Sequence, residues 1–123
     1  MGDEEMTKKE AKRIKDREEV LGWIAEVPKS CRGTGERLHK LILHSAPELN
    51  PRLWYGMPGY AKEGPVLCFF RKDKYWQFGV TEKASFPIEE DAPDQLMAQS
   101  WFFTGLDEAT DARIAAIVKK ATQ

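Results

Sequence analysis

The stretch that decides the fold is residues 65–80, PVLCFFRKDKYWQFGV. Apolar and aromatic residues fill positions 65–71 and 75–80, and the charged triplet Lys72-Asp73-Lys74 lies between them. Two such runs separated by a short polar turn are typical of a β-hairpin. The sequence therefore predicts two antiparallel strands with the charged triplet at their tip.

Alternation along this hairpin predicts which side chains share a face of the sheet. In the first strand, one face is expected to carry Val66, Cys68 and Phe70, and the other Leu67 and Phe69. In the second strand, the residues expected on one face are Trp76, Phe78 and Val80, opposite Tyr75, Gln77 and Gly79. Because the first strand is apolar on both faces, we expect it at the centre of the sheet.

Further strand segments flank the hairpin in the sequence. Upstream, residues 52–55 suit a short strand, Gly56-Met57-Pro58-Gly59 is expected to interrupt it, and pairing resumes at Tyr60-Ala61. Downstream, Trp101-Phe102-Phe103 is expected to add an edge strand.

Apolar spacing predicts helices at both ends of the chain. Residues 20–27 carry one apolar stripe and end at Pro28, and a second helix is expected from an N-cap at Thr34 to about residue 46. Residues 107–121 predict a third helix, acidic at its start and basic at its end. The first two helices, joined by a short connection, are expected to pack as an antiparallel pair.

These elements predict an α+β fold. We expect a mostly antiparallel β-sheet with an N-terminal helical pair and a C-terminal helix packed on one side of it. Residues 1–20 carry seven acids and six bases and few large apolar side chains. Residues 1–19 are therefore interpreted as a charged N-terminal helical extension, and residues 20–123 as a single α+β domain.

Composition excludes several classes of protein. The 123 residues are 41% hydrophobic and 32% charged, with 19 basic and 20 acidic side chains. A chain of this length and composition can form a single hydrophobic core. The net charge of −1 argues against a dedicated nucleic-acid binder. No stretch approaches the ~20 apolar residues of a membrane span, and the acidic start does not resemble a secretion signal. We therefore expect a cytoplasmic protein that binds neither nucleic acid nor membrane.

Charge is unevenly distributed along the chain. Residues 21–80 contain five acids and nine bases, a balance of +4, whereas residues 81–123 contain eight acids and four bases, a balance of −4. An anionic ligand is therefore expected to approach the middle of the chain and a cation the end. The candidate cation ligands are the acids Glu89, Glu90, Asp91 and Asp94.

Catalytic groups are few. Cys31 and Cys68 lack the close pairing of a zinc site and are expected to be reduced thiols. His39 and His44 lie five residues apart, which turns them ~140° from one another on a helix and prevents them from sharing a metal. We expect a protein without enzymatic activity, with an enzyme using His39 or Cys31 as the alternative.

Aromatic residues, 11% of the chain, exceed what one face of a sheet needs. Surplus Tyr and Trp side chains often line a pocket or an interface, since each has one apolar body and one polar tip. Met57 would add an adaptable apolar contact between them. The candidate ligand-binding residues are Trp54, Tyr55, Gly56, Met57, Pro58, Tyr60 and Trp76.

Residues 54–61, WYGMPGYA, resemble the YGMPxY core of the YdhG-like family, bacterial domains of unknown function that include a proposed frataxin-like intracellular iron chaperone. The resemblance extends to residues 36–49, 66–70 and 106–115, and leaves out a divergent loop at 82–100. It implies an α/β sandwich in a cytoplasmic protein. For one branch it implies delivery of ferrous iron to iron–sulfur cluster or haem assembly.

Two functions follow as expectations. The first is a binding module that contacts a small ligand or a protein partner through the aromatic surface around residues 54–60. The alternative is an iron chaperone that carries Fe2+ on the acids at 89–94. In either case we expect a monomer or a weak homodimer.

Overall fold

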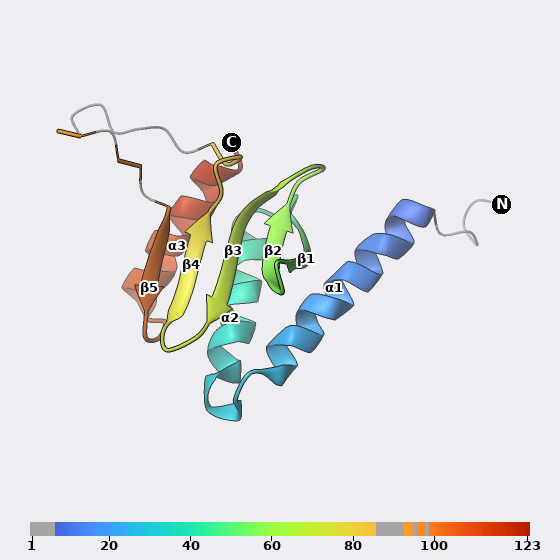
Figure 1. Cartoon of the computed structure of the whole chain (residues 1–123), viewed down its shortest axis with the longest axis horizontal. Helices are drawn as coiled ribbons and strands as arrows, with labels where there is room; N and C mark the ends of the chain where they lie inside the picture. Colours follow the sequence, from blue (N-terminus) through green and yellow to red (C-terminus); the bar gives the residue numbers. More distant parts are fainter. Residues whose placement is uncertain (1–6, 86–92, 95, 98) are drawn as a thin grey trace.

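The computed structural model describes residues 7–85, 93–94, 96–97 and 99–123. Its elements, in chain order, are α1 (Lys8–Glu26), α2 (Lys29–Ser45), β1 (Asn50–Trp54), β2 (Met57–Ala61), β3 (Val66–Lys72), β4 (Trp76–Val80), β5 (Ser100–Phe103) and α3 (Glu108–Ala121). Figure 1 shows the sheet in the middle of the molecule, with α1 crossing beside β1 and β2 at one end and α3 behind β4 and β5 at the other.

The five strands form an antiparallel meander in the order β1-β2-β3-β4-β5. The predicted hairpin is β3 and β4, and β3 is the central strand, as its two apolar faces predicted. β5 is an edge strand, as expected of residues 101–103.

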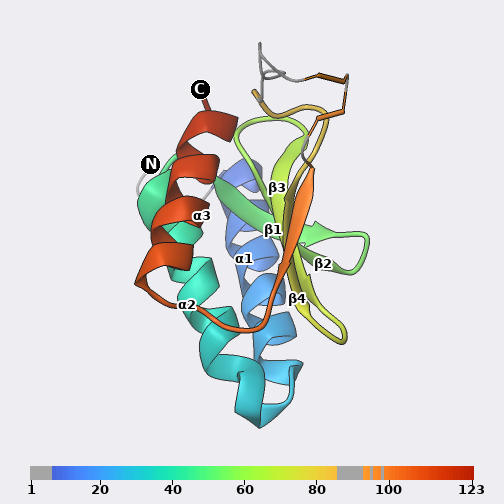
Figure 2. The same ribbon diagram turned by 90° about the vertical axis from the view of Figure 1, so that its left-hand side faces the viewer.

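All three helices pack on one face of the sheet (Figure 2). The predicted α+β fold is therefore confirmed. The core between the two layers contains Val20 and Ile24 of α1, Leu38 and Ile42 of α2, and Val118 of α3. We call this covered side the inner face; no described helix lies on the other side, the outer face.

The alternation predicted for β3 is wrong at its start because β3 contains a β-bulge. Tyr60 pairs with Cys68 and Ala61 pairs with Val66, so Leu67 has no partner across the ladder. The extra residue turns both Leu67 and Cys68 into the core. Val66 moves to the outer face, where its methyl groups lie beside Gly59.

The predicted start of the second helix is also wrong. α2 begins at Lys29 directly after Pro28, and it continues through Gly33, Thr34 and Gly35. A Cβ on Gly35 would lie 3.1 Å from the indole of Trp76 and 3.4 Å from Ile24. The glycine thus permits close packing of α2 against β4 and α1, rather than a break in the chain.

From Lys8 onward, the charged N-terminal segment and the amphipathic stretch from Val20 belong to one uninterrupted helix, α1. Thr7 caps its start by accepting a hydrogen bond from the backbone N–H of Glu10. Lys9 and Arg13 each form an ion pair of 2.8 Å with Glu63, which lies in the loop between β2 and β3. These exposed pairs orient the polar half of α1 along the sheet and add little stability.

The closest packing on the outer face involves Gly79. An added Cβ there would lie 2.6 Å from Cζ of Phe69 and 2.9 Å from Cβ of Ser100. Gly79→Ala is therefore expected to displace the Phe69 ring and lower the free energy of unfolding by about 1–3 kcal/mol. Urea denaturation followed by tryptophan fluorescence measures this change.

Gly22 provides the matched control for that substitution. It lies on the exposed side of α1, and no heavy atom would lie within 4 Å of its added Cβ. Gly22→Ala is expected to raise the free energy of unfolding by about 0.5–1 kcal/mol, because alanine favours the helix. If the two substitutions changed stability in the same direction, the close packing inferred at Gly79 would be wrong.

Candidate functional site

The turn between β1 and β2 consists of only two residues, Tyr55 and Gly56. Both have positive φ, 52° and 76°, as a type I′ hairpin turn requires. Asn-Gly is the sequence that favours this turn, whereas a bulky side chain with left-handed φ costs about 1–2 kcal/mol. Tyr55 is nevertheless 84% exposed. It occupies a strained position with little burial to offset the cost.

Tyr55 begins a row of three aromatic rings on the outer face. Its ring meets that of Trp54 edge-on at 4.7 Å, and Trp54 meets Phe69 at 5.1 Å between centroids. We call these three residues the aromatic row. Gly59 and Gly79 lie beneath the aromatic row. A Cβ on Gly59 would lie 2.8 Å from Cβ of Trp54, and a Cβ on Gly79 would clash with the ring of Phe69. The bare backbone at both positions lets the row lie close to the sheet.

The predicted interruption at Gly56-Met57-Pro58-Gly59 is wrong beyond Gly56, because β2 already begins at Met57. The turn instead includes Tyr55, which was expected at the end of the preceding strand. Strand alternation then divides the predicted binding residues between the two faces of the sheet. Those gathered at the turn and on the outer face are Trp54, Tyr55, Gly56 and Met57. Those buried on the inner face are Pro58, Tyr60 and Trp76.

Tyr60 forms a buried polar contact instead of a surface. A hydrogen bond of 2.8 Å joins its hydroxyl to Nδ1 of His39 on α2. Burial, together with the nearby Cys68, raises the pKa of Tyr60 well above its ordinary value. Burial also lowers the pKa of His39, as do the positive charges of Arg17 and Lys40. The pair therefore holds a neutral imidazole against a neutral phenol and ties α2 to β2.

The residues of the enzyme alternative, Cys31 and His39, both lie on α2, and Cys68 is in the core. Burial raises the pKa of the Cys68 thiol to about 12, which leaves it unreactive at neutral pH. Cys31 is half-buried near the start of α2, and His39 is occupied by Tyr60. Neither Cys31 nor His39 lines either of the two cavities described for this fold.

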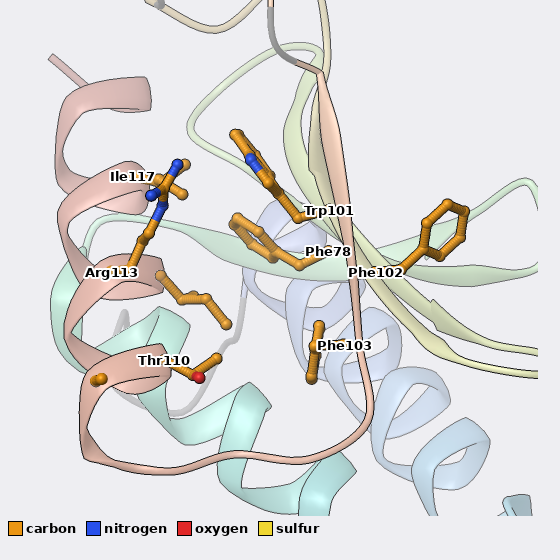
Figure 3. Close-up of a pocket in the computed structure, with 9 residues that line it drawn as sticks. Phe78, Trp101, Phe102, Phe103, Thr110, Arg113 and Ile117 are labelled. Atoms are coloured by element: carbon orange, nitrogen blue, oxygen red, sulfur yellow. The ribbon is translucent and has the colours of Figure 1, made fainter.

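The larger cavity, of about 330 Å³, lies on the inner face between α3 and the strands β4 and β5. Figure 3 shows Phe78, Trp101 and Phe103 pointing from the sheet toward α3, with Thr110, Arg113 and Ile117 opposite them, while Phe102 points to the other side. The sequence did not predict this site. The spacing of 110, 113 and 117 on one helical face was visible, but nothing in it indicated which strands the helix would face.

The predicted metal ligands fall mostly outside the described residues, which exclude Glu89, Glu90 and Asp91. Asp94 is exposed, and its carboxylate accepts a hydrogen bond of 2.9 Å from the backbone N–H of Leu96. Within the described ranges, no group of three or more His, Cys, Asp or Glu side chains could hold a metal ion. Iron carriage at 89–94 stays a prediction from the sequence.

No family model, curated protein or solved structure matches this chain. The resemblance to the YdhG-like family therefore stays a prediction as well. Among the described residues, none of the helices combines the length and apolar character needed to cross a membrane.

The His39–Tyr60 pair predicts a pH dependence of stability. Because the folded protein disfavours the imidazolium and the unfolded chain does not, the contribution of neutral His39 is present above pH ~6.5 and is lost as pH falls below it. The free energy of unfolding is expected to fall between pH 7.5 and 5.5 in the wild type, and to fall less in His39→Gln. Urea denaturation at a series of pH values measures both slopes.

His44→Gln is the control, since His44 lies exposed on the same helix. This variant is expected to keep the pH dependence of the wild type. Equal slopes for His39→Gln and the wild type would show that His39 is not held neutral by the fold.

Proposed function

We propose that this protein is a binding module whose aromatic row docks an acidic, partly apolar segment of another polypeptide. The observation that carries the proposal is Tyr55, an 84% exposed ring held at φ 52° in the turn. Strain of this kind is retained mainly where it serves a function. Figure 2 supports an accessible location, because the β1–β2 hairpin extends away from the side that the helices cover.

The shape of the surface favours a polypeptide over a small molecule. Small ligands bind in concave sites that enclose most of their area, whereas the exposed end of the aromatic row, Tyr55, lies on a turn, Trp54 is half-buried and Phe69 is buried. Tyr, Trp, Met and Arg are the residues enriched at the centres of protein interfaces. Three of these types, Tyr55, Trp54 and Met57, meet at the turn.

The charge of the outer face favours an acidic partner. Arg52 pairs with Gly59 across the ladder, so its side chain shares the face of the aromatic row. Arg71 lies two residues beyond Phe69 on the same face, and its contact with Asp73 is long, at 3.5 Å. Lys74 lies over the ring of Tyr75 at the β3–β4 tip. These cations would attract carboxylates and orient an acidic segment along the sheet.

Tyr55→Asn tests the proposal because it should change stability and binding in opposite directions. Asparagine tolerates the left-handed turn, so the free energy of unfolding is expected to rise by about 1 kcal/mol. Peptides selected by the wild type from a random phage-displayed 12-residue library should be rich in Asp, Glu and apolar residues. These peptides are expected to bind Tyr55→Asn about tenfold or more weakly than the wild type, because loss of a hot-spot residue has an effect of this size.

Leu21→Ala is the control for binding, since Leu21 is an exposed apolar residue on α1, away from the aromatic row. It should bind the selected peptides as the wild type does. Peptides that bind Tyr55→Asn equally well, or selection without enrichment of acidic residues, would contradict the proposal. So would Tyr55-dependent binding of a dT12 oligonucleotide, or self-association of the chain that Tyr55→Asn abolishes, because each identifies a different partner.

A further inference from the structure

The cavity beneath α3 exists because α3 packs on α2 more than on the edge of the sheet. Arg37 of α2 makes an ion pair with Asp111 of α3, which anchors the start of the helix there. β5 extends the sheet beyond this contact, so a space of about 330 Å³ remains between β5 and the helix. That volume lies at the lower end of the range found for small-molecule sites, roughly 300–1,000 Å³.

The walls of the cavity are apolar and largely aromatic. Phe78 and Trp101 are stacked, with centroids 6.3 Å apart and planes 20° from parallel. Phe103 extends the aromatic wall and stacks in turn on Trp76 of the core. From the other side, Ile117 faces the rings and is 9% exposed. A flat apolar body inserted between the rings and Ile117 would cover surface that the fold leaves open.

Polar groups lie on the helix side of this apolar space. Thr110 and Arg113, one turn apart on α3, both line the cavity (Figure 3). The guanidinium of Arg113 makes no ion pair with any described residue, whereas the neighbouring acid, Asp111, is already paired with Arg37. An unpaired guanidinium beside an apolar cavity is suited to bind a carboxylate through two hydrogen bonds.

We propose that this cavity binds an aromatic monocarboxylate, with its ring system between Trp101 and Ile117 and its carboxylate on Arg113. The site lies on the inner face, across the sheet from the aromatic row. It is independent of the proposed polypeptide partner, so either proposal can fail without the other.

The probe is 2-naphthoate, added to the wild-type protein and followed by 1H–15N NMR with the four tryptophan indole signals assigned. The indole signal of Trp101 and the amides of Thr110 and Arg113 are expected to shift, with a dissociation constant below about 1 mM, as small ligands of this size can reach. Signals of Trp54 and Tyr55 should stay in place. No shift at 5 mM, or shifts confined to Trp54 and Tyr55, would overturn the proposal.

Arg113→Met tests the role of the guanidinium while it preserves the length of the side chain. It is expected to weaken 2-naphthoate about tenfold and to leave the neutral probe 2-naphthylmethanol unchanged. Lys119→Met, which removes the same charge from the same helix outside the cavity, should bind both probes as the wild type does. Equal affinity of Arg113→Met and the wild type for 2-naphthoate would overturn the proposal.

A third variant, Thr110→Phe, fills the space itself and should abolish binding of both probes. Its thermal unfolding transition, compared with that of the wild type, establishes that the fold is intact. Retained binding of 2-naphthoate by folded Thr110→Phe would place the ligand elsewhere and overturn the proposal. Tighter binding of octanoate than of 2-naphthoate would contradict the aromatic character of the ligand.

Discussion

The ring of Phe70, in the middle of the central strand, is the contact on which the rest of the fold depends. It is fully buried and meets three other rings: Trp23 of α1 edge-on at 5.9 Å, Tyr60 of β2 at 6.0 Å and Trp76 of β4 at 6.1 Å. One side chain thereby joins a helix to three adjacent strands. Tyr60 extends the connection to α2 through its hydrogen bond with His39, so the cluster sets the distance between the two layers.

This inward cluster determines what the outer face can offer. Because successive residues of a strand point to opposite sides, burial of Tyr60 and Pro58 directs Met57 and Gly59 outward, and the paired strand β1 directs Trp54 outward as well. The short segment around the turn thus serves two purposes at once. Half of its side chains complete the core, and the other half form the surface that we assign to a partner.

The two proposed sites share a physical feature. At each of them, another side chain or closer packing would make the folded protein more stable. At the turn, Tyr55 holds a backbone conformation that asparagine or glycine would adopt at lower cost. Beneath α3, apolar rings line a space that better packing would have closed. Departures from local consistency of this kind are expected at functional positions. The two lie on opposite faces of one sheet.

The sequence by itself determined the β3–β4 hairpin, the central place of β3, the edge strand and the third helix, because each depends on local alternation, spacing or end chemistry. It did not determine the bulge at Leu67 or the course of α2 through Gly33 and Gly35. The bulge depends on how β3 pairs with the distant Ala61, and the close approach at Gly35 depends on the distant Trp76. Likewise, the pattern at 54–60 identified aromatic residues but not the face of the sheet on which each lies. The cavity could not be predicted either, because it depends on where α3 lies relative to β5. Tertiary structure decided these points because side-chain direction and the spacing between layers arise from contacts between segments far apart in the chain.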